Sequence, residues 1–549
     1  MTVSDGNENT ENSENIKSVY TEYDRKKTKP SHETKMNIFS LKLFEVLPSK
    51  SELKQYSGVI LCGVTLWGAL WFILQDTVLP GATIFNMAGI VTVGYVFGHT
   101  LERYTTISAM AGMTLIGALY RNFGQSDLFE SPIADAIDFH LRRIYPVIIL
   151  TKGPLGWNWP YIKNNSVKVF LLATLPWIVE CLSTAFFTHV LLEYPWYWAL
   201  HLGAILSSVS PAVVVPTVMA FSAKGFGNKK RIALLVANAG GLDTAFTEGM
   251  FGVINSAIFY PSPPTYRIIK AFLAIFLGIG LGVAWGILAD ILPDQKDPYA
   301  ATVRSILIFT GGLLLSYAAG FLGWGGTSGV AIMVCAATAT TRWSKHGWPI
   351  NNNPVATVYN VLWLIFEPML FTLSGYYLEV SQMTLKEFGL IVACIIFALL
   401  LRLITAFLVA LANSLTVKES LFIAVTWIPK AIVEAVLVRV ATDSLWKEGV
   451  SEQDKKIATQ QANIIVIAIL LMTTLGSGLT TILGPILLSH DSKVGDSEFH
   501  QTPSISPIQP YDITRRKNTT ASVHFIDSLC DKLLFITRAS DEMIEYQNS

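Results

Sequence analysis

SSVSPAVVVP, residues 207–216, interrupts an apolar part of the chain with three serines and two prolines. A second stretch, WIPKAIVEAV at 427–436, places a proline beside a lysine and a glutamate. Proline removes a backbone donor and leaves a carbonyl unpaired, which lipid cannot satisfy, so such breaks persist where they line a polar cavity. Interrupted helices in both halves of a chain are typical of transporters with inverted repeats and a site near the middle of the bilayer. The alternative is two ordinary proline kinks.

Apolar runs surround both stretches and recur from about residue 57 to residue 487. The chain has 549 residues, of which 51% are hydrophobic and 15% charged, and its mean hydropathy is +0.45. Each run can cross a hydrocarbon core about 30 Å thick. We therefore predict an all-α polytopic membrane protein with about 14 transmembrane helices. The predicted spans are 57–75, 82–99, 105–120, 142–152, 166–185, 196–222, 231–259, 267–291, 303–322, 327–341, 355–377, 386–412, 418–441 and 461–487.

Three segments are predicted. Residues 1–56 form a cytoplasmic N-terminal tail with a candidate interfacial helix at 36–47, residues 57–487 form the transmembrane domain, and residues 488–549 form a cytoplasmic C-terminal tail. Basic loops such as SAKGFGNKKR at 222–231 alternate with poorly basic ones, which predicts that both termini are cytoplasmic. The sequence does not distinguish the plasma membrane from an internal membrane.

Several classes of function are disfavoured by composition. The formal net charge is zero, so nothing indicates nucleic acid as a partner. The five cysteines are scattered and the histidines dispersed, which predicts no disulfide framework and no metal site beyond a transported ion. We predict a transporter rather than an enzyme, without a cofactor.

Ionisable residues inside the predicted spans are the main candidates for function. Each costs roughly 2.5–3.5 kcal/mol on insertion scales, so an intramembrane charge indicates a functional site by default. Because acids and bases both occur, we expect Asp243 to pair with Lys430 and Glu180 to pair with Arg402. The alternative is that Asp243 and Lys430 form a purely structural clamp. The candidates are Glu180, Asp243, Glu248, Glu367, Arg402, Lys430 and Glu434.

Helical spacing relates the charges of GLDTAFTEGM, residues 241–250, to one another. Thr244 and Glu248 share a helix face, whereas Asp243 lies about 100° away from Thr244. Lys430 and Glu434 are likewise one turn apart. If the two helices face each other, these groups converge in a pocket of low dielectric constant. Burial and ion pairing oppose each other in such a pocket, so the site can exchange a proton for an ion near neutral pH.

Together these motifs resemble the animal sodium/proton antiporters of the monovalent cation:proton antiporter superfamily. The resemblance rests on SSVSPAVVVP, a following helix with GGLD, LLRLITAF at 400–407 and WIPKAIVEA, and it covers about residues 57–487. It implies a homodimer with a dimerisation part and a mobile core, working by alternating access. It also implies two crossed interrupted helices around the ion site, here the segments at Ser210–Pro211 and Pro429–Lys430.

One position departs from the family pattern. The resemblance implies paired aspartates, of which the second is the principal cation ligand and proton carrier, but this chain has Asp243–Thr244. Threonine offers a neutral hydroxyl and cannot carry a proton, so it removes a negative charge and a coupling group together.

Three hypotheses follow. In the first, Glu248 or Glu434 supplies the missing carboxylate and sodium (or lithium)/proton antiport persists, which the resemblance favours. In the second, the charge of Lys430 and the positive ends of half-helices favour proton-coupled chloride transport. In the third, the chain is a transport-inactive paralogue that regulates an active exchanger. The retained Asp243–Lys430 pair and both broken helices favour transport.

Overall fold

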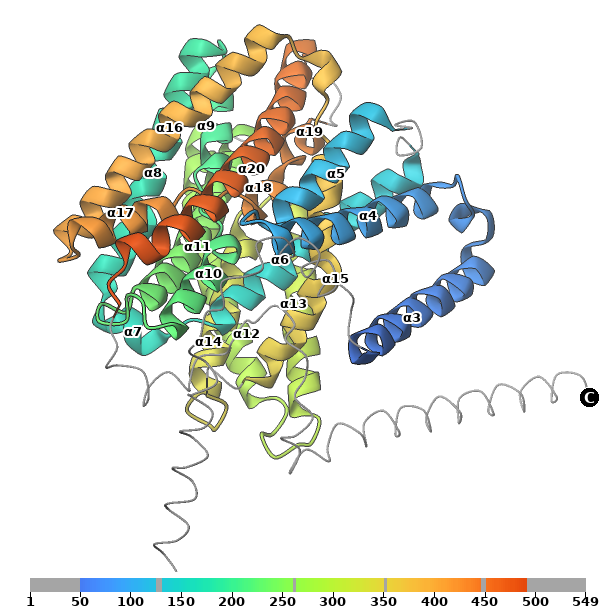
Figure 1. The fold of residues 1–549 in the computed structure, drawn as a ribbon, viewed down its shortest axis with the longest axis horizontal. Coiled ribbons are helices and arrows are strands. Elements are labelled where there is room, and N and C mark those ends of the chain that lie inside the picture. The colour runs from blue at the N-terminus through green and yellow to red at the C-terminus, as the bar shows by residue number, and fades with distance from the viewer. Residues whose placement is uncertain (1–49, 125–130, 260–262, 350–352, 446–450, 491–549) are drawn as a thin grey trace, which may run out of the picture. The chain divides into compact units, whose positions relative to one another are not determined.

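A computed structural model describes residues 50–124, 131–259, 263–349, 353–445 and 451–490 (Figure 1). Within these ranges the chain is helical and has no strand, apart from an isolated β-bridge between Phe226 and His490. The predicted interfacial helix at 36–47 and the C-terminal tail from residue 491 lie outside the described residues.

Contacts divide the chain into two units, Met1–Leu70 with Gln509–Ser549, and Trp71–Ile508. Helix α3 (Lys50–Leu74) belongs largely to the first unit and is therefore considered by itself. Exposed apolar side chains, among them Leu61 and Phe72, lie along it. Residues 60–78 are long and apolar enough to span a membrane.

The larger unit contains the remaining helices. Each of the fourteen predicted spans, the first of which falls in α3, coincides with one helix or with consecutive helices separated by a break. The helices are α4 (Thr83–Tyr104), α5 (Ala109–Phe123), α6 (Pro132–Leu155), α7 (Trp159–Asn164), α8 (Ser166–Leu191), α9 (Trp196–Leu206), α10 (Pro211–Ala223), α11 (Ile232–Phe259), α12 (Pro264–Ile291), α13 (Ala300–Leu322), α14 (Thr327–Trp343), α15 (Pro354–Gly375), α16 (Leu385–Ala412), α17 (Val417–Thr426), α18 (Ile432–Leu437), α19 (Val440–Ser444) and α20 (Glu452–Leu487), with short 3-10 segments at Gln75–Val78 and Val380–Gln382.

By length and apolar composition alone, nine segments in the described part of the chain qualify as membrane spans. Helix α11 is not among them although it has 28 residues, because glycines, threonines, Asp243 and Glu248 lower its hydropathy. Helix α14 has only 17 residues. The prediction of an all-helical membrane protein is confirmed, while the total of about 14 spans stays a prediction.

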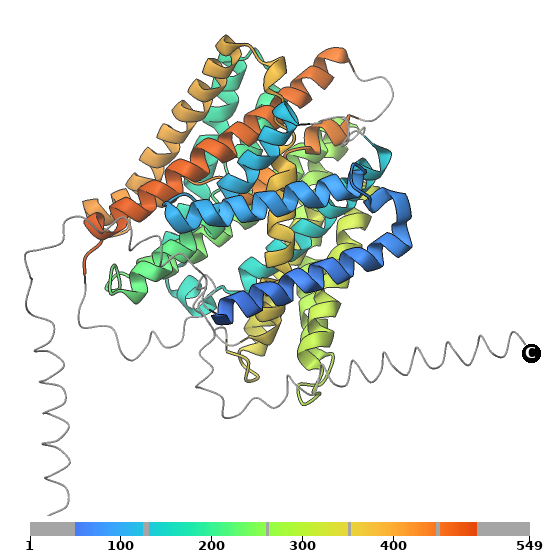
Figure 2. The ribbon, with the colours of Figure 1, turned by 45° about the vertical axis from the view of Figure 1, so that its right-hand side comes forward.

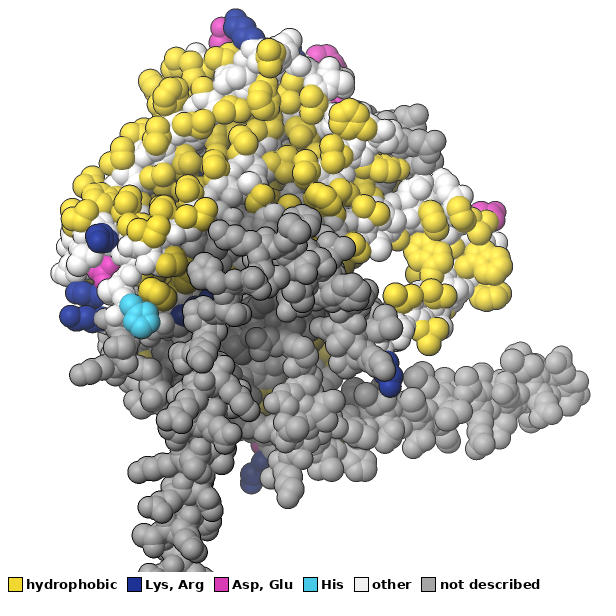
Figure 3. Space-filling model, in the orientation of Figure 1, with side chains coloured by type: hydrophobic (Ala, Val, Ile, Leu, Met, Phe, Trp, Pro, Cys, Tyr) yellow, Lys and Arg dark blue, Asp and Glu magenta, His cyan; other side chains and the backbone are white. Residues whose placement is uncertain are grey.

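Local sequence explains where several helices begin. The hydroxyls of Thr384 and Thr416 each accept a hydrogen bond from the backbone N–H three residues later, and the carboxylates of Glu387 and Glu419 accept one from the backbone N–H of the cap residue. Helices α16 and α17 therefore start with capping boxes. Apolar side chains cover the broad face over α8, α16 and α20, and charged side chains gather at its ends (Figure 3). Phe170, Phe186, Phe397, Ile404 and Leu408 are exposed on α8 and α16, as expected for a face in contact with lipid.

Both interruptions predicted from proline are present. Helix α9 ends at Leu206 and α10 begins at Pro211, whereas α17 ends at Thr426 and α18 begins at Ile432. A proline in the first turn of α10 loses no intrahelical hydrogen bond, because that N–H would have no helical partner.

Long helices hold the two breaks in place. Helices α8 and α16 lie side by side in both views (Figure 1, Figure 2), α11 packs on α8 and α10, and α20 packs on α10 and α17. At Gly476 of α20 a Cβ atom would lie only 2.3 Å from Pro429 Cγ, so glycine allows α20 to approach the second break closely.

Candidate functional site

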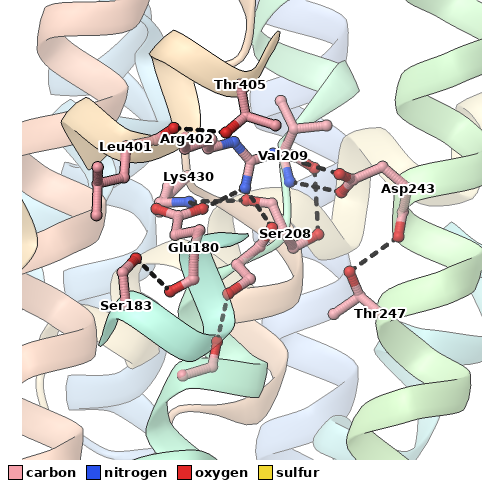
Figure 4. Close-up of polar contacts among 12 residues, drawn as sticks. Glu180, Ser183, Ser208, Val209, Asp243, Thr247, Leu401, Arg402, Thr405 and Lys430 are labelled. Atoms are coloured by element: carbon pink, nitrogen blue, oxygen red, sulfur yellow. Dashed lines mark hydrogen bonds and ion pairs between the residues drawn. The ribbon is translucent and has the colours of Figure 1, made fainter. Parts of the chain in front are cut away.

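The two helix breaks meet. The backbone N–H of Ser210, at the end of the first break, donates to the carbonyl of Pro429 in the second, at 2.9 Å. Cationic side chains cover carbonyls that the first break leaves free: Lys430 Nζ donates to Ser208 O at 3.1 Å, and Arg402 Nη1 donates to Ser207 O (Figure 4). Irregular backbone therefore lies inside the protein, where protein donors satisfy it.

Four charged side chains from four segments converge at this point. Glu180 comes from α8, Asp243 from α11, Arg402 from α16 and Lys430 from the second break. All four are at most 2% exposed. We call Glu180, Asp243, Arg402 and Lys430 the buried ion cluster.

Glu180 lies between the two cations of the cluster. Its Oε2 accepts from Lys430 Nζ at 2.8 Å and from Arg402 Nη1 (Figure 4). Asp243 has two different partners: Arg402 Nη2 lies 3.3 Å from Oδ2, and the backbone N–H of Val209 donates to Oδ1 at 2.8 Å. The carboxylate of Asp243 is thus attached both to the cluster and to the first helix break.

The expected ion pair between Asp243 and Lys430 is wrong in this structure. Lys430 pairs with Glu180, and Asp243 pairs with Arg402, which also makes the expected contact with Glu180. The reason is the shape of the side chains. The fork of an arginine presents five N–H donors and can bridge two carboxylates, whereas an ammonium is a compact charge that binds whatever acceptors lie at the end of its stem.

Thr244 does not contribute its hydroxyl to the cluster. Its Oγ1 donates to Gly240 O at 3.2 Å, one turn earlier in α11, and the side chain is half-buried. Thr247 similarly donates to Asp243 O at 2.8 Å, so both threonines bond to their own helix.

The two candidate replacement carboxylates lie in different surroundings. Glu434 is wholly buried in α18, and neither of its carboxylate oxygens has a hydrogen-bond partner. Glu248 is half-buried and faces α14, where a Cβ atom at Gly329 would lie 2.8 Å from its Oε2. No cation lies within ion-pair distance of Glu248 in the described ranges. Glu248 therefore lies outside the buried ion cluster.

The polar residues of the breaks differ in role. Pro211 begins α10, and Pro429 supplies the carbonyl that joins the breaks. The hydroxyl of Ser210 is buried without a hydrogen-bond partner. No group of three or more His, Cys, Asp or Glu side chains in the described segments is arranged to hold a metal ion.

A second polar region, which the sequence reasoning missed, lies beyond α18. Arg439 contacts Asp135 at 2.9 Å, Asp443 at 3.3 Å and Asp138 at 3.6 Å, while Arg142 contacts Asp138 at 2.9 Å. Arg439 and both α6 aspartates also line a cavity of about 360 Å³. The i, i+4 spacing of Asp138 and Arg142 was the available signal, but it identified neither Arg439 nor Asp443 as a partner.

Comparison with known proteins decides the family. The family model described as "Sodium/hydrogen exchanger, transmembrane" matches residues 79–487, which is most of the chain. The chain belongs to the sodium/hydrogen exchanger family. This confirms the resemblance drawn from the broken helices and their charges, and it makes the protein a member of a family of membrane transporters.

Curated relatives and solved structures agree with this assignment. The chain is 28% identical over 476 residues to mouse sodium/hydrogen exchanger 9B2, covering 84% of each chain. It is 28% identical over 440 residues to human sodium/hydrogen exchanger 9B1, covering 79% of this chain and 83% of the relative. The fold is similar to that of the sodium proton antiporter MjNhaP1 from Methanocaldococcus jannaschii, with a TM-score of 0.60 at 20% identity, covering 74% of this chain and 98% of the other.

Proposed function

We propose that this exchanger moves a monovalent cation, sodium or lithium, across a membrane in exchange for protons at the meeting point of its two helix breaks. The observation that carries the proposal is Asp243. It is a wholly buried carboxylate, bonded both to the backbone of one break and to the buried ion cluster. Hard cations such as sodium prefer oxygen ligands, and an ionised carboxylate buried where the two breaks meet supplies negative charge and oxygen atoms at that point.

The wider architecture belongs to the same proposal. About 14 spans would place both termini in the cytoplasm, and the broken helices would cross at the site as the paired elements of two inverted repeats. A core containing the cluster would move against a dimerisation part in a homodimer. The plasma membrane and an internal membrane both suit this architecture.

Neither alternative hypothesis gains support. Chloride transport required the positive charge of Lys430 to be available, but this ammonium lies 2.8 Å from Glu180. The named relatives are sodium/hydrogen exchangers. A transport-inactive paralogue would not need an unpartnered buried carboxylate such as Glu434, because burying one is costly and a scaffold gains nothing from it.

Proton movement in proteoliposomes tests the proposal. Purified full-length protein is reconstituted with an internal pH dye, and sodium gluconate, lithium gluconate or choline chloride is added outside. We expect a pH change with sodium or lithium and none with choline chloride. Asp243→Asn is the matched variant, and we expect it to lower the sodium response at least tenfold. A response to choline chloride alone would indicate anion coupling, and silence in all three would indicate a transport-inactive protein.

A further inference from the structure

Glu434 is a buried acid whose carboxylate has no hydrogen-bond partner among the described residues. The side chain is 0% exposed, and both carboxylate oxygens are without a hydrogen-bond partner. An ionised carboxylate buried in this way is costly unless another positive charge reaches it. Glu434 therefore needs a bound proton or a bound cation.

The charges around Glu434 determine how much positive charge the site must bind. Lys430 precedes Glu434 by four residues, and it contacts Glu180, which in turn contacts Arg402. Arg402 and Lys430 carry two positive charges, and Glu180 and Asp243 carry two negative ones, so the buried ion cluster is neutral by itself. An ionised Glu434 brings the total to −1, which one proton or one monovalent cation neutralises.

The same region offers a second oxygen atom for a cation. The hydroxyl of Ser210 is buried and unpartnered, and Ser210 belongs to the break that is hydrogen-bonded to the break preceding Glu434. Most buried polar atoms in proteins have a partner, so the unpartnered oxygens of Ser210 and Glu434 are both open to a ligand. Carboxylate and hydroxyl oxygens suit a hard cation.

Glu248 does not share these properties. It lies five residues from Asp243, which is about 140° round the helix, and it packs against Gly329 of α14. Like Glu434, it has no cation within ion-pair distance in the described part of the chain, but its side chain is partly exposed, whereas that of Glu434 is wholly buried. Its charge is therefore separated from the neutral cluster.

We propose that Glu434 is the coupling carboxylate of this exchanger, binding a proton and the transported cation in alternation. This inference rests on the proposed cation/proton exchange. In one half of the cycle the O–H bond of the Glu434 carboxylic acid breaks and the proton leaves to one side of the membrane. The carboxylate then binds sodium, which leaves to the other side before a proton returns. A site with a single negative charge holds either the proton or the sodium ion, but not both. Each ion must therefore leave before the other binds, which makes the transport an exchange.

The proteoliposome assay, run on the full-length chain, tests the proposal with two matched variants. We expect Glu434→Gln to lower sodium-driven proton movement at least tenfold, and Glu248→Gln to stay within twofold of the wild type. The thermal midpoint of Glu434→Gln in detergent should be equal to or higher than that of the wild type, because glutamine removes a buried charge without breaking a hydrogen bond. A purely structural carboxylate would instead give a lower midpoint.

The outcomes separate this inference from the proposed function. If the wild type does not respond to sodium or lithium, the proposed exchange fails and the inference fails with it. If the wild type responds and Glu434→Gln responds within twofold of it, only the role of Glu434 fails. A Glu434→Gln protein that does not fold would also overturn the proposal, since the proposal predicts no loss of stability.

Glu434→Asp tests direct binding, because it keeps a carboxylate on a side chain one methylene shorter. We expect this variant to retain exchange with a several-fold change in the half-saturating sodium concentration. An unchanged value would contradict direct binding.

Discussion

At the scale of single residues, Glu180 organises the site. Its carboxylate bridges Lys430 and Arg402, and Arg402 carries the connection on to Asp243. Removing one partner of a buried ion pair is strongly destabilising, by about 3–5 kcal/mol, because it leaves an uncompensated charge. The proposed role of Asp243 thus depends on Glu180, which need not itself contact the transported ion.

A double-mutant cycle tests these partner assignments. We expect Lys430→Met and Glu180→Gln to couple by about 1–3 kcal/mol in the free energy of unfolding, because the two groups are in contact. Lys430→Met and Asp243→Asn should couple more weakly, because these two groups share no direct contact and are connected only through Glu180 and Arg402. Thermal or denaturant unfolding in detergent measures both. A larger coupling for the Asp243 cycle would restore the pairing expected from the sequence.

At the scale of helices, the second break depends on how closely α20 approaches it. Gly476 faces Pro429, while Thr473 of α20 donates its hydroxyl to the carbonyl of Lys430. The helix therefore supplies both a surface without a side chain and a hydrogen bond to the unwound backbone. This explains how an interrupted segment keeps one conformation inside a membrane protein.

Substituting Gly476 tests the role of α20. A Cβ atom there would lie 2.3 Å from Pro429 Cγ and 2.8 Å from the Pro429 backbone nitrogen, so Gly476→Ala should destabilise the protein by about 1–3 kcal/mol, the usual cost of overpacking. Sodium-driven exchange should fall as well, because the break moves. Gly478→Ala is the control on the same helix, since its nearest neighbour would be Thr106 Oγ1 at 3.6 Å. Equal stability of the two variants would show that the contact is unimportant.

At the scale of the whole molecule, the arrangement of basic loops gives a testable orientation. The loops at 222–231 and 341–348 carry clusters of lysine and arginine. Short loops of this kind stay on the cytoplasmic side. With about 14 spans, both termini should lie on that side too.

Accessibility of tagged termini measures the orientation. In whole cells, epitopes placed before residue 1 and after residue 549 should bind antibody once the plasma membrane alone is opened, and not before. An epitope in the poorly basic loop before α9, at Glu193, should bind antibody on intact cells if the protein lies in the plasma membrane, or only after the organelle is also opened if it lies in an internal membrane. Termini on opposite sides would mean an odd number of spans and would contradict the proposed topology.

The sequence by itself determined the elements of this protein. The length of the apolar runs predicted the helices, and proline beside serine or lysine predicted both breaks. These signals are local, because an unpaired backbone group costs free energy in lipid whatever the rest of the chain does. The sequence also identified the seven ionisable residues inside the predicted spans and the family to which the chain belongs. It could not decide which charges touch. The partner of Asp243, and the difference between Glu434 and Glu248, depend on how α8, α11, α16 and the two breaks are rotated and spaced against one another. Those contacts join residues up to 250 positions apart in the chain, so only the tertiary structure decides them.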